Sequence, residues 1–259
     1  MCYSREKPRE KEKEDRMRFQ DKVVVITGGA SGIGKTIRDR FEAEGAKTAI
    51  IDIQPNDYFQ GSVSDQRLLE QFAAKVIRDF GKVDILVNNA KPIMQGIDEC
   101  SYEAFSHALA VGVSGPFYLT RLFMPVFSDQ ASVINITSTR QDQSMPQTES
   151  YAAAKGALAA LTHAMAVSLA PKVRVNAIAP GWISADGTVY AGADAAQQPL
   201  GRVGTPDDIA DLALFLASPQ AGFITGQNIA VDGGMSRLMI YHNEHGWTYQ
   251  VPDESGKKQ

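Results

Sequence analysis

A tyrosine and a lysine, Tyr151 and Lys155, stand four residues apart in the alanine-rich stretch YAAAK. Residues at this separation lie on the same face of a helix, so a phenol and an ammonium can act together on one small molecule that binds beside that face. The spacing is equally typical of a solvated helix face without a chemical role. Other parts of the chain therefore have to decide between the two interpretations.

A glycine-rich turn is the first such part. The segment TGGASGIG, residues 27–34, lies between the β-branched run VVVIT and a helical pattern that places Ile33 and Ile37 on one stripe. Amides at a helix N-terminus attract a pyrophosphate, and Gly28, Gly32 and Gly34 let the backbone approach it closely. The spacing is G-x-x-x-G-x-G rather than G-x-G-x-x-G, and a turn of this kind can also be only a tight connection.

The acidic residue Asp52 ends the next predicted strand, KTAIID. A carboxylate at this position can accept both ribose hydroxyls of a dinucleotide and would repel a 2′-phosphate. No Lys or Arg stands inside the glycine-rich turn or directly after Asp52. The sequence therefore favours NAD over NADP, and the simpler alternative is that Asp52 is a turn residue at the end of a strand.

Strand-like and helix-like segments alternate along the chain, which predicts an α/β fold with a doubly wound parallel sheet of about seven strands in a single domain. We expect helices near residues 32–45, 64–80, 101–127, 151–169 and 205–218, and strands near residues 23–27, 47–52, 83–89, 132–138, 173–181 and 228–234. Residues 53–59 are expected to be a loop, because the link after Asp52 is too short for a crossover helix.

The termini differ from the predicted domain, residues 17–237. Residues 1–16 carry mixed charges and almost no apolar side chains, so we expect a disordered N-terminal extension. Residues 238–259 form a C-terminal extension, in which His242, Glu244 and His245 have ligand chemistry without a complete ligand set. No metal site is predicted.

The overall composition limits the partners. The formal net charge is −4, with 44% hydrophobic and 22% charged residues, which gives no electrostatic reason to expect nucleic acid or an anionic membrane. No apolar run is expected to be long enough to span a bilayer. The two cysteines, Cys2 and Cys100, fit a reducing interior and predict a cytoplasmic protein that acts on a small molecule.

With these residues in place, residues 18 to about 237 resemble the single-domain short-chain dehydrogenase/reductase family, which has a Rossmann-type fold. TGGASGIG is similar to the cofactor loop of that family, and NNA at residues 88–90 to the motif after its fourth strand. Ser138, Tyr151 and Lys155 match its catalytic serine, tyrosine and lysine, and the order and spacing of these motifs together are highly specific.

The resemblance implies an NAD-dependent oxidoreductase that moves a hydride between the nicotinamide and a secondary alcohol or ketone. A free phenol has a pKa of about 10, and a nearby ammonium would lower it. Tyr151 is therefore expected to act as the general acid–base, with Lys155 lowering its pKa and Ser138 orienting the substrate oxygen.

The resemblance also implies wider binding sets. The substrate set is Ser138 with Arg140 and Trp182 from loops beyond the strand ends, and Arg140 either pairs with a substrate carboxylate or phosphate or is tied to a neighbouring loop. The family's common tetramers imply a homo-oligomer, either a tetramer or a dimer. The cofactor set is Gly28, Ser31, Gly32, Ile33, Gly34, Asp52, Ser62, Val63, Asn88, Ala90, Tyr151, Lys155, Pro180, Gly181 and Ile183.

Three residues depart from the family pattern. Gly112 stands where the family usually has an asparagine that helps to hold a proton-relaying water, which leaves open a catalytically impaired dinucleotide-binding protein with a sensing or assembly role. Lys91 replaces a usual glycine, and either favours an anionic substrate or points into solvent. Ser62 stands where an aspartate commonly lies beside the adenine.

Overall fold

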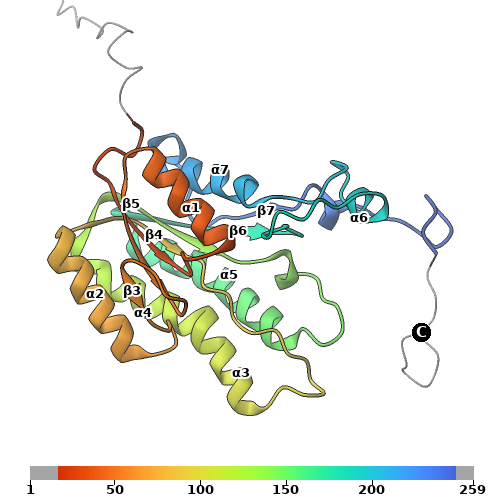
Figure 1. Cartoon of the computed structure of the whole chain (residues 1–259), viewed down its shortest axis with the longest axis horizontal. Coiled ribbons are helices and arrows are strands. Elements are labelled where there is room, and N and C mark those ends of the chain that lie inside the picture. Colours follow the sequence, from red (N-terminus) through yellow and green to blue (C-terminus); the bar gives the residue numbers. More distant parts are fainter. Residues whose placement is uncertain (1–16, 249–259) are drawn as a thin grey trace, which may run out of the picture.

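Seven parallel strands form one sheet in the order β3-β2-β1-β4-β5-β6-β7 (Figure 1). The computed structural model describes residues 17–248, so the predicted N-terminal extension lies outside the described residues. The strands are β1 (Val23–Thr27), β2 (Lys47–Asp52), β3 (Phe59–Gln60), β4 (Val83–Asn88), β5 (Phe127–Ile136), β6 (Val173–Pro180) and β7 (Asn228–Val231). This is the Rossmann-type doubly wound sheet that the sequence predicts.

Helices cover both faces of the sheet, because the strands are apolar on both faces. In β1, Val24 and Ile26 pack with helices α1 (Gly32–Ala43) and α7 (Pro206–Ala217). Val25, which points the other way, packs with the opposite core. That core is built on α2 (Gln66–Phe80), α4 (Gly115–Phe123) and α5 (Glu149–Leu169), which lie below the sheet in Figure 1.

The connection between β2 and β3 differs from the predicted loop. Phe59 belongs to a strand, paired with Ile51 of β2, although the connection contains no helix. The side chain of Asn56 explains this tight return. Its Oδ1 accepts from the backbone N–H groups of Tyr58 (3.0 Å) and Phe59 (2.8 Å), and its Nδ2 donates to the carbonyl oxygens of Gln54 and Phe59, both at 3.0 Å. Asn56 thus forms hydrogen bonds with backbone N–H and carbonyl groups of the turn, which in a crossover helix would bond to one another.

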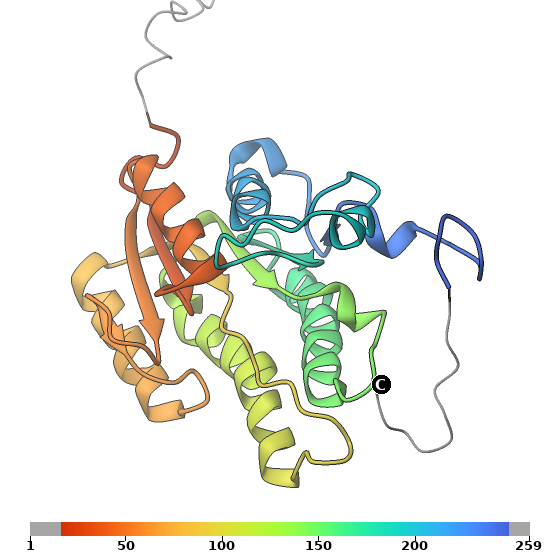
Figure 2. The same ribbon diagram turned by 45° about the vertical axis from the view of Figure 1, so that its right-hand side comes forward.

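The predicted helix at residues 101–127 is divided. Helix α3 (Tyr102–Leu109) runs into a π-helical turn (Ala110–Ser114) and then into α4, while Phe127 already begins β5. Figure 2 shows α3 and α4 as one bent column with α5 beside it. The stretches Tyr102–Val126 and Glu149–Leu169 are long and apolar enough to cross a membrane by length and composition, contrary to the sequence expectation. Both nevertheless contribute side chains to the core, among them Leu119 and Met165.

The C-terminal segment leaves the sheet after β7. Residues 238–248, the described part of the predicted extension, contain turns, and the Trp247 ring lies edge-on to that of His242 at 6.2 Å. Figure 2 shows this segment at the side of the domain, next to the short helix α6 (Ala193–Ala196).

Candidate active site

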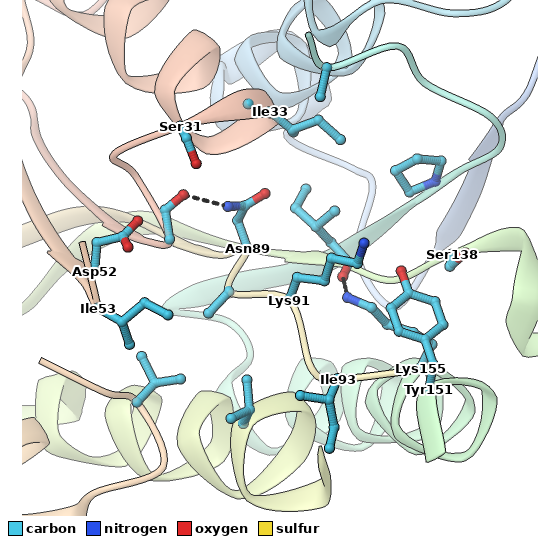
Figure 3. Close-up of a pocket in the computed structure, with 18 of the residues that line it drawn as sticks. Ser31, Ile33, Asp52, Ile53, Asn89, Lys91, Ile93, Ser138, Tyr151 and Lys155 are labelled. Atoms are coloured by element: carbon cyan, nitrogen blue, oxygen red, sulfur yellow. Dashed lines mark hydrogen bonds between the residues drawn. The ribbon is translucent and has the colours of Figure 1, made fainter. Parts of the chain in front are cut away.

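The strand order reverses between β1 and β4, and in open α/β sheets ligands bind in the crevice outside the strand ends at such a point. A cavity of about 490 Å³ opens there, within the range of ligand pockets (Figure 3). The predicted site residues that line it are Gly28, Ser31, Gly32, Ile33, Asp52, Ser62, Val63, Ala90, Ser138, Tyr151, Lys155, Pro180, Gly181 and Ile183.

The glycine-rich turn fits a bound pyrophosphate. Gly28 has φ +67°, and a Cβ there would lie 3.0 Å from the Cα of Ala90, so only glycine fits. At Gly32, a Cβ would meet only Ala185, which leaves an open surface toward the cavity. Ser31 at the N-cap of α1 makes no capping bond, and the first turn holds no acidic residue. The helix start therefore has N–H groups and a dipole available for an anion.

Asp52 is buried and held at the end of β2. Its Oδ2 accepts from the backbone N–H of Ala30 at 3.0 Å, and its Oδ1 accepts from that of Gln54 at 2.9 Å. A carboxylate has about four acceptor sites, so each oxygen keeps capacity for a ribose hydroxyl. Gln54 also donates to the Ser31 hydroxyl at 3.3 Å, which ties the turn after β2 to the glycine-rich turn.

The ends of β1 and β4 are joined by Thr27 and Asn89. The hydroxyl of Thr27 accepts from the backbone N–H groups of Asn89 (2.9 Å) and Ala90 (3.0 Å), and the Asn89 amide donates to the carbonyl oxygens of Thr27 and Gly28. Asn88, which the sequence assigns to the cofactor, points elsewhere and donates to Asn135 inside the sheet at 2.8 Å. Within the NNA motif, the second asparagine lines the cavity and the first does not.

Ser138, Tyr151 and Lys155 line the other end of the same cavity. Ser138 follows β5, and its hydroxyl accepts from the backbone N–H of Arg140 at 3.2 Å. Tyr151 and Lys155 lie on one face of α5, with the Lys155 nitrogen 5.5 Å from the centre of the Tyr151 ring. Figure 3 shows the three side chains, with Lys91 extending toward them.

Burial controls the protonation of this group. Burial, together with the charge of Lys91, lowers the pKa of Lys155 to about 7. Burial raises the pKa of Tyr151, against the lowering effects of the Ser138 hydroxyl and the Arg140 charge. The expectation that Lys155 lowers the pKa of Tyr151 is therefore wrong for the free protein, because desolvation of the phenol dominates and burial disfavours the lysine charge itself.

The departure at Gly112 has a steric cause. Gly112 lies in the π-helical turn, and a Cβ on it would come within 2.8 Å of the Ala154 Cβ and 3.4 Å of the Pro92 Cγ. The backbone thus keeps a helix distortion of the kind often found at functional sites, without the asparagine. A side chain at residue 112 would press on α5 beside Lys155.

Four predicted site residues do not line the cavity. Gly34 allows close packing, since a Cβ there would lie 2.0 Å from the carbonyl oxygen of Gly28. Asn88 faces the sheet, Trp182 packs on Tyr190 with ring centres 4.6 Å apart, and the Arg140 guanidinium contacts the Met94 sulfur at 3.3 Å. The lining residues missing from the predicted sets are Ile51, Ile53, Gln54, Gly61, Asn89, Lys91, Ile93, His107, Val111, Ile136, Thr137 and Ala185.

Most of these residues adjoin predicted ones in the same turns, and the sequence singles out Lys91 as a departure from the family pattern. His107 differs, since it comes from α3, and its Nε2 lies 3.3 Å from the Ser64 hydroxyl at the end of the cavity that contains Ser62. Within residues 17–248, no group of three or more His, Cys, Asp and Glu side chains is placed to hold a metal ion.

Comparison with known proteins supports the class of protein that the sequence motifs indicate, an oxidoreductase. The family model described as enoyl-(acyl carrier protein) reductase matches residues 28–236. An uncharacterized oxidoreductase of Thermotoga maritima is 37% identical over 253 positions, covering 86% of this chain and 99% of the relative. The 3-oxoacyl-[acyl-carrier-protein] reductase of that organism is 32% identical over 244 positions, covering 85% and 99%.

A comparison with a solved structure also supports an oxidoreductase. The apo SCOR enzyme from Clostridium thermocellum is 43% identical, with a TM-score of 0.82, and the alignment covers 89% of this chain and 99% of that one. Fold, site and relatives together define an NAD(P)-type oxidoreductase. The chain belongs to the short-chain dehydrogenase/reductase family. The alternative of an impaired dinucleotide-binding protein finds no support among these relatives.

Proposed function

We propose that this protein is an NAD-dependent oxidoreductase that interconverts a secondary alcohol and a ketone. The observation that carries the proposal is the convergence of Ser138, Tyr151 and Lys155 at one end of a cavity whose other end holds the glycine-rich turn and Asp52. One ligand that spans the cavity would thus place its phosphates at the start of α1 and its reacting ring beside Tyr151.

The preference for NAD follows from the charges around the ribose site. Asp52 offers carboxylate oxygens to the two ribose hydroxyls and would repel a 2′-phosphate. The nearby cations of α1 are paired with acids, Lys35 with Asp39 and Arg38 with Asp39 at 3.1 Å. Among the residues that line the cavity, the only Lys or Arg side chains are Lys91 and Lys155, at the catalytic end.

The bound nicotinamide supplies or accepts the hydride. Because burial raises the pKa of Tyr151, its phenol is protonated at neutral pH in the free protein, which is the form that donates a proton to a ketone oxygen. The Ser138 hydroxyl accepts from the Arg140 N–H and also lowers the Tyr151 pKa, so it lies beside the phenol, where a bound substrate oxygen would compete for its hydrogen. In its protonated form, Lys155 uses one hydrogen on the Ile136 carbonyl oxygen and keeps two for groups beside Tyr151.

The test follows the absorbance of the reduced cofactor while the protein is offered a panel of secondary alcohols and ketones. We expect NADH-dependent reduction of at least one ketone and a loss of about 10²- to 10⁴-fold in kcat for Tyr151→Phe. Tyr102→Phe, at an 82% exposed tyrosine on α3, is the matched control and should retain the parent rate. Equal turnover by the parent and Tyr151→Phe would refute the mechanism.

Two further expectations accompany this proposal. A cytoplasmic location and assembly into a homo-oligomer stay predictions. The second is checked by light scattering of the purified full chain, for which a dimer or tetramer mass is expected.

A further inference from the structure

Two cations, Lys91 in the cavity lining and Arg140 near Ser138 and Tyr151, have no acidic partner in the part of the chain that the structure describes. Within residues 17–248, no carboxylate forms an ion pair with Lys91 or Arg140. The guanidinium of Arg140 instead contacts two thioethers, the sulfur of Met94 at 3.3 Å and that of Met145 at 3.9 Å. A thioether is a weak acceptor, so the hydrogen-bonding capacity of Arg140 is largely unused.

The negative charge in the cavity lies far from these cations. Asp52 is the only carboxylate among the residues that line it, and both of its oxygens already accept backbone N–H groups. Figure 3 shows Asp52 at the opposite end of the cavity from the Lys91 ammonium, which is directed toward Tyr151 rather than toward Ser31. The catalytic end is therefore a positively charged compartment without an anion of its own.

We propose that the substrate is itself an anion: a hydroxy acid and its oxo acid, whose carboxylate binds Lys91 and Arg140. This inference rests on the proposed function and names the substrate class of that same site. In the reducing direction the ketone carbon takes the hydride from the reduced cofactor, which is oxidised, and the ketone oxygen takes the proton from Tyr151. The carboxylate remains unchanged.

Both cations act at the reacting end. The charge of Lys91 is felt at Lys155, and that of Arg140 at Tyr151. Arg140 also contacts Met94, which lies in the same loop as Lys91, so this contact joins the turn after β5 to the loop that carries Lys91. A planar carboxylate matches the fork of a guanidinium and can accept from an ammonium at the same time.

Apolar side chains lie beside the two cations, Ile93 in the cavity lining and Met94 and Met145 against Arg140, which suits the carbon skeleton of such an acid. Ile93 lines the cavity and is 37% exposed, and Met94 and Met145 are 45% and 56% exposed. Methionine side chains adapt to ligands of irregular shape. A substrate with a charged end and a short apolar body therefore fits better than a polyol, which would need several hydrogen-bonding groups here.

The experiment compares matched probes on the full chain with NADH: acetoacetate, its ethyl ester, acetoacetyl phosphate and an acetoacetyl thioester. We expect kcat/KM for the free acid to exceed that for the ester at least tenfold. In Lys91→Gln and Arg140→Gln this acid-to-ester ratio should fall at least tenfold, mainly through KM for the acid. Lys172→Gln, at an exposed lysine next to the start of β6, should leave the ratio unchanged.

Several outcomes would overturn the inference. One is an ester or thioester turned over as well as the acid, and another is a preference for the phosphate over the acid. Equal losses on acid and ester in Lys91→Gln would mean a role in catalysis rather than in recognition. A weaker affinity for NADH in that variant would instead place Lys91 on the cofactor phosphates.

A binding measurement separates this inference from the proposed function. The Tyr151→Phe protein loaded with NADH is titrated with each probe while the fluorescence of bound NADH is followed. Tighter binding of the acid, reduced by Lys91→Gln, supports the anion site even if no probe is turned over. Tyr151-dependent reduction of neutral ketones without any carboxylate preference refutes the inference and leaves the oxidoreductase function intact.

Discussion

The ammonium of Lys155 donates to the carbonyl oxygen of Ile136 at 2.6 Å and so fixes the middle of α5 against the end of β5. The side chain is 2% exposed, and burial lowers its pKa to about 7, with the Lys91 charge as the second cause. An unfolded lysine has a pKa near 10.4, so the unfolded chain binds more protons between these two values. The contribution of Lys155 to stability therefore rises with pH from about 7 to about 10.4 and is least favourable below pH 7.

Lys155→Met tests this linkage. The variant removes the cost of the buried charge, so the Tm of the variant minus that of the parent should decrease as pH rises from 7 to 9.5. Thermal unfolding of both free proteins by circular dichroism at three pH values measures the difference. A constant difference would mean that Lys155 keeps an ordinary pKa. Lys172→Met, at an exposed lysine, provides the control with no trend expected.

Asp52 should set the choice between the two cofactors. We expect the parent to bind NADH at least about tenfold more tightly than NADPH, which is about 1.4 kcal/mol. In Asp52→Asn the ratio should shrink, because the charge that repels a 2′-phosphate is gone and one acceptor oxygen is lost. Fluorescence titrations with both cofactors measure it, with Asp129→Asn, at an exposed aspartate of β5, as the control. A parent preference for NADPH would contradict the assignment.

The long strands and helices could be predicted because their patterns are local. VVVIT and KTAIID coincide with β1 and β2, and the helix expected near residues 205–218 is α7, which a capping box of Thr205 and Asp208 opens. Strand β3 could not be predicted in this way. Its two residues carry no periodic signal, and the turn before it depends on the contacts of the Asn56 side chain.

The candidate site shows the same limit. Ser138, Tyr151, Lys155 and Asp52 were found because motif and spacing select them, and the structure brings all four to one cavity. Which asparagine of NNA faces that cavity depends on the direction of each side chain at the end of β4. The protonation of Tyr151 depends on burial, which no spacing rule supplies.

Asn56 should be important for both stability and cofactor binding. Asn56→Ala leaves two backbone N–H groups and two carbonyl oxygens without their partner, and because these groups are exposed or partly buried, each lost hydrogen bond should cost only about 0.5–1.5 kcal/mol. We expect a lower Tm and weaker NADH binding, because the turn also positions Gln54 beside Asp52. Asn56→Asp keeps the acceptor and should lose less. An unchanged affinity and Tm in Asn56→Ala would refute the proposed role of this turn.

Gly112 and Ala154 should be energetically coupled. In Gly112→Ala the new Cβ would meet the Ala154 Cβ at 2.8 Å, and such overpacking costs about 1–3 kcal/mol, more than the helix propensity gained from alanine. We expect lower stability and lower turnover, since Ala154 directly precedes Lys155. Ala154→Gly removes the opposing methyl group, so Gly112→Ala should cost about 1 kcal/mol less in that background and lose less turnover. Denaturant unfolding of the two single variants and the double variant measures the coupling, and additivity within about 0.5 kcal/mol would show that residue 112 and α5 do not compete for space.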